Sequence, residues 1–187
     1  MGSITPGPNN LLVMRSGAAF GIRRTLLHIL GIQFGFIGLM VLAWLGVGAL
    51  LLAVPAALSA LRIGCFAYLL WLAWQIVRDG RVRAGDAPGP RGRPMNVAEG
   101  MLFQLVNPKA WMMAITAANA FYGGAQPGPR DLAAAILVCT SIGGPSMIAW
   151  TAWGAAIDHL LRQPRTKERF SYAMAALVVA SAIWMLR

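Results

Sequence analysis

Polar residues that could bind a small charged molecule stand beside prolines in two short segments of the chain. These segments are Thr5-Pro6-Gly7-Pro8-Asn9-Asn10 and Asn107-Pro108-Lys109-Ala110. Lys109 offers an ammonium for an anionic group such as a carboxylate. Asn9 and Asn10 can cap a helix that begins there, and a helix N-terminus carries about half a positive charge, which attracts anions. The two segments are therefore the candidate binding site.

The same segments cannot lie inside a continuous helix. A proline removes one backbone donor and displaces the carbonyl four residues earlier, so Pro108 would free the carbonyl of Gln104. In hydrocarbon, interrupted backbone persists only where protein or a polar cavity covers it. Pro8 and Pro108 stand 100 residues apart. Two interrupted helices in corresponding positions are typical of transporters that bind their substrate at the interruptions.

The composition predicts a membrane protein. The chain is 58% hydrophobic and 12% charged, whereas about 25% of residues are charged in a soluble domain. Five stretches reach the roughly 20 apolar residues that a spanning helix needs: Leu26–Val54, Ala56–Val77, Val97–Tyr122, Leu132–Ile157 and Phe170–Leu186. A sixth, from the N-terminus to Phe20, is too short, and we expect its outer half to precede Met1. The predicted fold is an all-α membrane protein with six hydrophobic segments, the first one truncated.

The net charge of +10 does not predict a nucleic-acid partner, because the basic residues are distributed by side of the membrane. Twelve lysines and arginines lie around the first, third and fifth connections, and three lie on the opposite side. This asymmetry places the basic loops in the cytoplasm and both termini outward. The same loops would contact anionic membrane lipids.

The organisation is a single membrane domain, residues 1–187, made of two halves. A basic, Gly- and Pro-rich linker, residues 78–95, separates residues 1–77 from residues 96–187. Each half has three segments, and an odd number makes the halves enter the membrane in opposite senses. We therefore expect two inverted three-helix repeats with broken helices at the Thr-Pro-Gly-Pro-Asn and Asn-Pro-Lys motifs. Aligning Pro8 with Pro108 also places Asn9 on Lys109 and a hydroxyl on the same face of each helix.

Twelve residues make up the predicted substrate pathway: Thr5, Pro6, Gly7, Pro8, Asn9, Asn10, Gln33, Gln104, Asn107, Pro108, Lys109 and Thr116. Gln33 and Gln104 are the best of the polar residues at membrane depth, although interhelical hydrogen bonding is the default for such side chains. Lys109 either meets substrate or the coupling ion, pairs with freed carbonyls, or extends to the interface. Glu99 either relays protons or pairs with an arginine of the linker.

The sequence argues against an enzyme. Its two histidines, His28 and His159, lie on different segments, so no histidine metal cluster forms, and neither a metal nor a cofactor is expected. No nucleophile elbow or phosphate-binding loop is present. Cys65 and Cys139 stand alone in apolar runs and are interpreted as small buried hydrophobic residues. The remaining alternatives are a non-transporting membrane homologue or assembly partner, and a passive channel.

The motifs resemble those of the LysE-type translocators. The similar segments are Ser3–Asn10 followed by an apolar half-helix and Gly21, Gly64–Trp74, and Asn107–Ala110. This resemblance implies a multi-pass protein of the bacterial inner (plasma) membrane that exports amino acids or their derivatives, driven by the proton motive force. Its implied partners are a small amino-acid substrate, protons and membrane lipids, and a homo-oligomer is left open. One departure is that only four residues precede Thr5, fewer than in the family.

Overall fold

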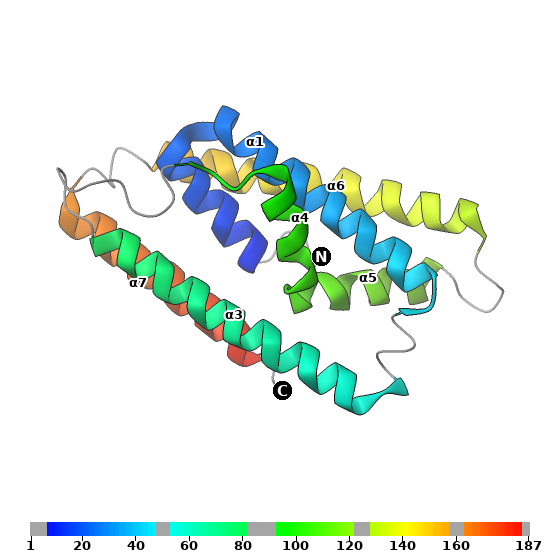
Figure 1. Ribbon diagram of the computed structural model, residues 1–187. Helices are drawn as coiled ribbons and strands as arrows, with labels where there is room; N and C mark the ends of the chain where they lie inside the picture. The colour runs from blue at the N-terminus through cyan, green and yellow to red at the C-terminus, as the bar shows by residue number, and fades with distance from the viewer. Residues whose placement is uncertain (1–6, 48–52, 82–92, 122–127, 158–162, 185–187) are drawn as a thin grey trace.

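The computed structural model describes residues 7–47, 53–81, 93–121, 128–157 and 163–184, and every regular element in these ranges is a helix (Figure 1). The helices are α1 (Pro8–Trp44), α3 (Pro55–Arg81), α4 (Val97–Leu105), α5 (Pro108–Phe121), α6 (Pro129–Ala156) and α7 (Pro164–Trp184). The all-α fold predicted from the sequence is confirmed over the residues described.

Helix α1 consists of two arms that meet at Gly21. This residue has φ 77° and ψ 171°, a conformation that is readily available only to glycine. The chain turns back on itself there (Figure 1). The Thr25 hydroxyl donates to the Gly21 carbonyl over 2.9 Å and lies 2.9 Å from the Ser16 hydroxyl, so the corner is held from both sides. We call residues 8–20 the first arm and residues 22–44 the second arm.

Helices α4 and α5 are separated by Val106 and Asn107. Pro108 occupies the first position of α5, where the missing N–H leaves no helical hydrogen bond unmade. The indole N–H of Trp111 donates to the Leu105 carbonyl over 2.9 Å and satisfies one of the last acceptors of α4. The chain therefore changes direction here without leaving that carbonyl unpaired.

The start of α4 is fixed by an ion pair. Asn96 and Glu99 form a capping box, in which each side chain binds the other residue's backbone N–H. The Arg93 guanidinium donates to both Glu99 carboxylate oxygens, over 2.8 and 3.0 Å. This hydrogen bond raises the pKa of Arg93 above its ordinary value. The prediction that Glu99 pairs with a linker arginine is confirmed.

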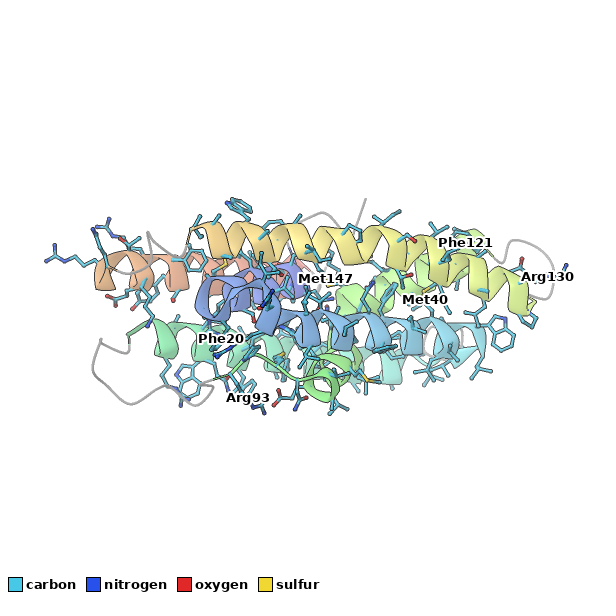
Figure 2. The ribbon with its side chains drawn as sticks, turned by 90° about the horizontal axis from the view of Figure 1, so that it is seen from above. Phe20, Met40, Arg93, Phe121, Arg130 and Met147 are labelled. Carbon is cyan, nitrogen blue, oxygen red and sulfur yellow. The ribbon has the colours of Figure 1, made fainter. Side chains whose placement is uncertain are left out.

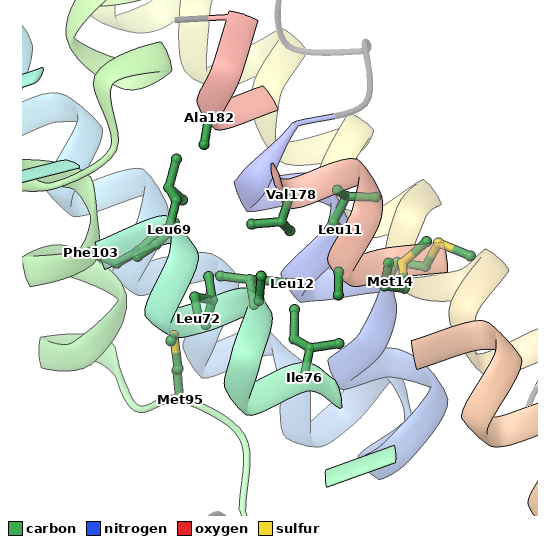
Figure 3. Close-up of a cluster of buried hydrophobic side chains, with 13 residues drawn as sticks. Leu11, Leu12, Met14, Leu69, Leu72, Ile76, Met95, Phe103, Val178 and Ala182 are labelled. Atoms are coloured by element: carbon green, nitrogen blue, oxygen red, sulfur yellow. The ribbon is translucent and has the colours of Figure 1, made fainter. Parts of the chain in front are cut away.

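The helices pack as two layers joined by the first arm. Helices α3 and α7 lie side by side, while α1 packs most extensively on α6 and then on α4 (Figure 1). A hydrophobic cluster connects the layers, with Leu11 and Leu12 of the first arm against α3, α4 and α7 (Figure 3). Its other fully buried members include Leu69, Leu72, Phe103 and Val178. This cluster positions the N-terminal end of the first arm in the middle of the molecule.

Glycines allow the first arm to approach α6 at backbone distance. A Cβ atom on Gly154 would collide with the carbonyl of Met14, and one on Gly17 would collide with the carbonyl of Thr151. The second arm meets α4 in the same way through Gly31. Small residues at such crossings are typical of helices packed in membranes.

The outer surface of the molecule is apolar. Helices α1 and α6, of 37 and 28 residues, are long and apolar enough to cross a membrane. Large hydrophobic side chains point outward from several helices (Figure 2). Exposed examples are Leu27, Phe34, Ile63, Trp74, Leu137 and Trp153. So much exposed apolar surface is what lipid covers in a membrane protein.

We predict that Gly154→Val lowers the free energy of unfolding by about 1–3 kcal/mol, because the new side chain forces the first arm and α6 apart. Gly64→Val is the matched control, since no atom of another described element lies within 4 Å of a Cβ at that position on α3. Both variants gain the same helix propensity. The measurement is the melting temperature in detergent. Equal melting temperatures for the two variants would contradict the close packing.

Candidate substrate site

Three side-chain amides meet where the two proline-containing segments come together. Asn9 Nδ2 donates to Gln104 Oε1 over 2.9 Å, and Gln104 Nε2 donates back to Asn9 Oδ1 over 3.1 Å. Asn107 Nδ2 also donates to Asn9 Oδ1, over 3.0 Å. We call Asn9, Gln104 and Asn107 the amide cluster. It joins residues that are more than 90 positions apart in the chain.

Each member of the amide cluster is positioned by its own helix. Asn9 is in the first turn of the first arm, and Asn107 immediately precedes α5. Gln104 lies in the last turn of α4, is fully buried, and also donates to the Gly100 carbonyl over 3.2 Å. Gln104 therefore anchors the Asn9 side chain to α4.

Asn107 carries a buried acceptor that no described residue satisfies. The side chain is 1% exposed, and its Oδ1 accepts no hydrogen bond within the part of the chain that the structure describes. The Nδ2 of the same amide is already bonded to Asn9. An unsatisfied buried acceptor costs about 1–3 kcal/mol, so the site favours a ligand or a water that donates to this oxygen.

The ammonium of Lys109 lies against the first segment. A Cβ on Gly7 would be only 2.7 Å from Lys109 Nζ. Any side chain at position 7 would thus displace the ammonium from its place beside the start of the first arm. The close approach brings a cation from one segment to the glycine of the other.

A pocket lies between these groups. Its empty space measures about 510 Å³, a volume that includes open solvent at its mouth. Its polar lining comes from Gly7, Asn9, Asn10, Gln33, Asn107 and Lys109, and its apolar lining from Ile32, Phe36, Ala110, Met113, Cys139, Gly143 and Met147. Met147 is on the side of α6 that faces α1 (Figure 2).

The polar lining combines positive potential with one unsatisfied acceptor. The first arm and α5 both begin at this pocket, and aligned peptide dipoles give each helix start a partial positive charge. Lys109 adds a full charge, and no aspartate or glutamate is among the described lining residues. The arrangement suits a carboxylate, while Asn107 Oδ1 suits an ammonium. A zwitterion carries both groups.

The structure brings most of the predicted pathway together. Half of the twelve residues line the pocket: Gly7, Asn9, Asn10, Gln33, Asn107 and Lys109. Pro8 and Pro108 begin the two helices, and Gln104 supports Asn9. Thr116 is exposed on α5 and does not line the pocket. Thr5 and Pro6 lie outside the described residues.

The apolar wall was not predicted from the sequence. Cys139, Gly143 and Met147 recur every fourth residue on α6, and Ile32 and Phe36 have the same spacing on the second arm. This spacing places each set on one helix face. This four-residue spacing was the signal from which the wall could have been predicted, but residues that face lipid or pack against other helices show the same spacing. Cys65 is buried as predicted, whereas Cys139 is half-buried in the pocket wall.

The fold and the pocket define a membrane transporter, and the chain belongs to the LysE-type translocator family. The family model described as LysE type translocator matches residues 1–186. A cysteine/O-acetylserine efflux protein of Klebsiella pneumoniae is 31% identical over 182 residues, covering 97% of this chain and 89% of the relative. The protein of the same name from Escherichia coli K12 is 26% identical, covering 97% and 90%. No solved structure matches the chain.

Membership in this family identifies the chain as an amino-acid exporter and not an enzyme. Exporters of the family are inner-membrane proteins, in agreement with the apolar exterior and the two long apolar helices. The resemblance first noted in the proline motifs is thus confirmed over the whole chain.

We predict that Asn9→Ala lowers the free energy of unfolding by about 1–3 kcal/mol, because it removes hydrogen bonds from both Gln104 and Asn107. Thr116→Ala is the control, since that side chain is exposed outside the pocket. The melting temperature in detergent reports the difference. If the two variants melt together, the amide cluster does not hold the segments in contact.

Proposed function

We propose that this protein exports small neutral amino acids across the inner membrane, with cysteine and O-acetylserine as the first candidates. The observation that carries the proposal is that Lys109 and Asn107 line the same pocket, and that the Asn107 side-chain oxygen has no partner among the described residues. Each offers a partner for one charge of a zwitterion. The candidates come from the names of relatives that are 26–31% identical to the chain.

The substrate is held by its main-chain groups in this proposal. Its carboxylate accepts from the Lys109 ammonium and from amides at the two helix starts, which are suited to anions. Its ammonium donates to Asn107 Oδ1. The side chain then faces the apolar wall, which has no charge with which to bind an acidic or basic side chain. This division favours neutral amino acids.

The two halves are proposed to be inverted repeats. With Pro8 aligned on Pro108, the first arm corresponds to α5, the second arm to α6, and α3 to α7. Helices α3 and α7, which correspond in this scheme, lie side by side, and Gln33 of the second arm donates to the Thr140 carbonyl of α6. A pseudo-two-fold axis would produce such pairing, because an element near the axis meets its own counterpart.

Transport is proposed to occur by alternating access. One helix triplet rocks against the other around the pocket, which opens to one side of the membrane at a time. The Thr-Pro-Gly-Pro-Asn and Asn-Pro-Lys motifs act as broken-helix elements that line the pathway from both halves. Entry of protons down their gradient drives export of the substrate.

The basic connections are proposed to face the cytoplasm, with both termini outward. At the linker ends, the Arg78 guanidinium lies 4.7 Å from the Trp74 ring centroid and Arg93 binds Glu99. Arginine and tryptophan together are typical of the membrane interface, which supports this assignment. Anionic lipids of the cytoplasmic leaflet are the expected partners of these arginines.

Transport by purified protein in proteoliposomes tests the function. We expect saturable counterflow of labelled cysteine, reduced roughly 30-fold or more in Lys109→Ala, because truncating one partner of a buried charge pair costs about 2 kcal/mol or more. Lys167→Ala is the control, since it removes the same charge from an exposed position on α7.

Three outcomes would contradict parts of this proposal. Export by Lys109→Ala at the wild-type rate would remove that lysine from the substrate site. Full-rate export after the proton gradient is dissipated would contradict proton coupling. Wild-type protein that moves no amino acid in this assay would favour the alternative of a non-transporting membrane homologue or assembly partner.

The orientation is tested by labelling single cysteines in whole cells. In a background of Cys65→Ala and Cys139→Ala, Ala87→Cys places a thiol in the linker, and Ala125→Cys places one between α5 and α6. A membrane-impermeant maleimide should modify position 125 in intact cells and position 87 only after lysis. The reverse pattern would show that the basic loops face outward.

A further inference from the structure

The apolar wall contributed by α6 contains a gap at Gly143. Cys139, Gly143 and Met147 lie on one face of the helix, and the residue between the two sulfur-containing side chains has none of its own. Met113 of α5 and Phe36 of the second arm also line the pocket. Of the three wall residues that α6 contributes, Gly143 is the one without a side chain.

The space at Gly143 belongs to the pocket and not to a helix contact. Among the described residues of other elements, a Cβ added there would meet only Gln33 Oε1, at 3.4 Å, which is ordinary van der Waals contact. No backbone atom of another described element lies within 4 Å. A methyl group would thus fit without moving α6, and it would occupy room inside the pocket.

Its neighbour Gly144 provides a contrast. A Cβ there would lie 3.2 Å from Gln33 Nε2, a tighter contact, and Gly144 does not line the pocket. Substitution at Gly144 would therefore press on the Gln33 amide, whereas substitution at Gly143 would add a methyl group to the pocket wall itself. Of these adjacent glycines, Gly143 is the one that faces the cavity.

Gln33 is held firmly enough to form the opposite side of this gap. Its Nε2 donates to the Thr140 carbonyl over 3.2 Å, which joins the second arm to α6 one turn before Gly143. The Thr140 hydroxyl is itself bonded to the Ile136 carbonyl over 2.7 Å. The bond from Gln33 to the Thr140 carbonyl orients the amide that lies opposite Gly143.

We propose that Gly143 is a specificity-determining residue, whose missing side chain makes room for the longer side chains among the neutral amino acids exported. This inference rests on the proposed function. A second observation supports ligand binding at the same pocket, because Asn107 lines it and its buried Oδ1 has no partner among the described residues. Cysteine has a short thiol side chain, whereas the acetyl ester of O-acetylserine is longer and reaches the gap.

The experiment measures export of labelled cysteine and O-acetylserine side by side in proteoliposomes. Gly143→Ala should lower the O-acetylserine rate relative to the cysteine rate by about tenfold, the usual effect of one methyl-sized change in an apolar pocket. Met113→Ala should shift the ratio the other way, because it enlarges the pocket. This second variant keeps the test decisive if Gly143→Ala is poorly folded.

Gly64→Ala is the control, and it should change neither rate. Equal rate losses for both substrates in Gly143→Ala, or an unchanged ratio in Met113→Ala, would overturn the inference. A wild-type protein that exports neither substrate would overturn the proposed function itself, and the two failures are thereby distinguished.

Discussion

In a bilayer, backbone and side chains that leave the helical pattern must find their hydrogen-bond partners within the protein. The amide cluster meets this requirement by joining the two proline-containing segments to each other. Asn9 Oδ1 accepts hydrogen bonds from both Gln104 and Asn107, and Asn9 Nδ2 donates one to Gln104 Oε1. The starts of the first arm and of α5 are consequently held together, and the pocket is the space they enclose with α6.

The same hydrogen bonds determine which group remains for a ligand. Asn107 Nδ2 donates to Asn9, and its Oδ1 is buried without a partner among the described residues. The Lys109 ammonium is held beside Gly7, where a side chain would displace it. One cation and one acceptor thus stand at the same pocket. The glycines where α1 crosses α6 and α4 allow these helices to pack closely enough to form the site, since bulkier residues would separate the helices.

Prolines are favoured at the first position of a helix, and Pro8 and Pro108 each begin one. Pro108 and the Gly21 corner limit helices for reasons that any sequence reading can apply, and the charged Lys109 was conspicuous in an apolar run. The apolar wall was different, because Met113 and Gly143 share their helical period with residues that face lipid or other helices. Thr116 does not line this pocket, and spacing along a helix does not tell which face meets the cavity.

In the proposed site, Lys109 and the two helix starts bind the carboxylate of a zwitterion, and Asn107 binds its ammonium. Calorimetric binding of cysteine and two analogues to the purified protein tests it most directly. Cysteamine lacks the carboxylate and 3-mercaptopropionate lacks the ammonium, while both keep the thiol. The account predicts that cysteine binds and that each analogue binds much more weakly. Binding of both analogues as tightly as cysteine would contradict it.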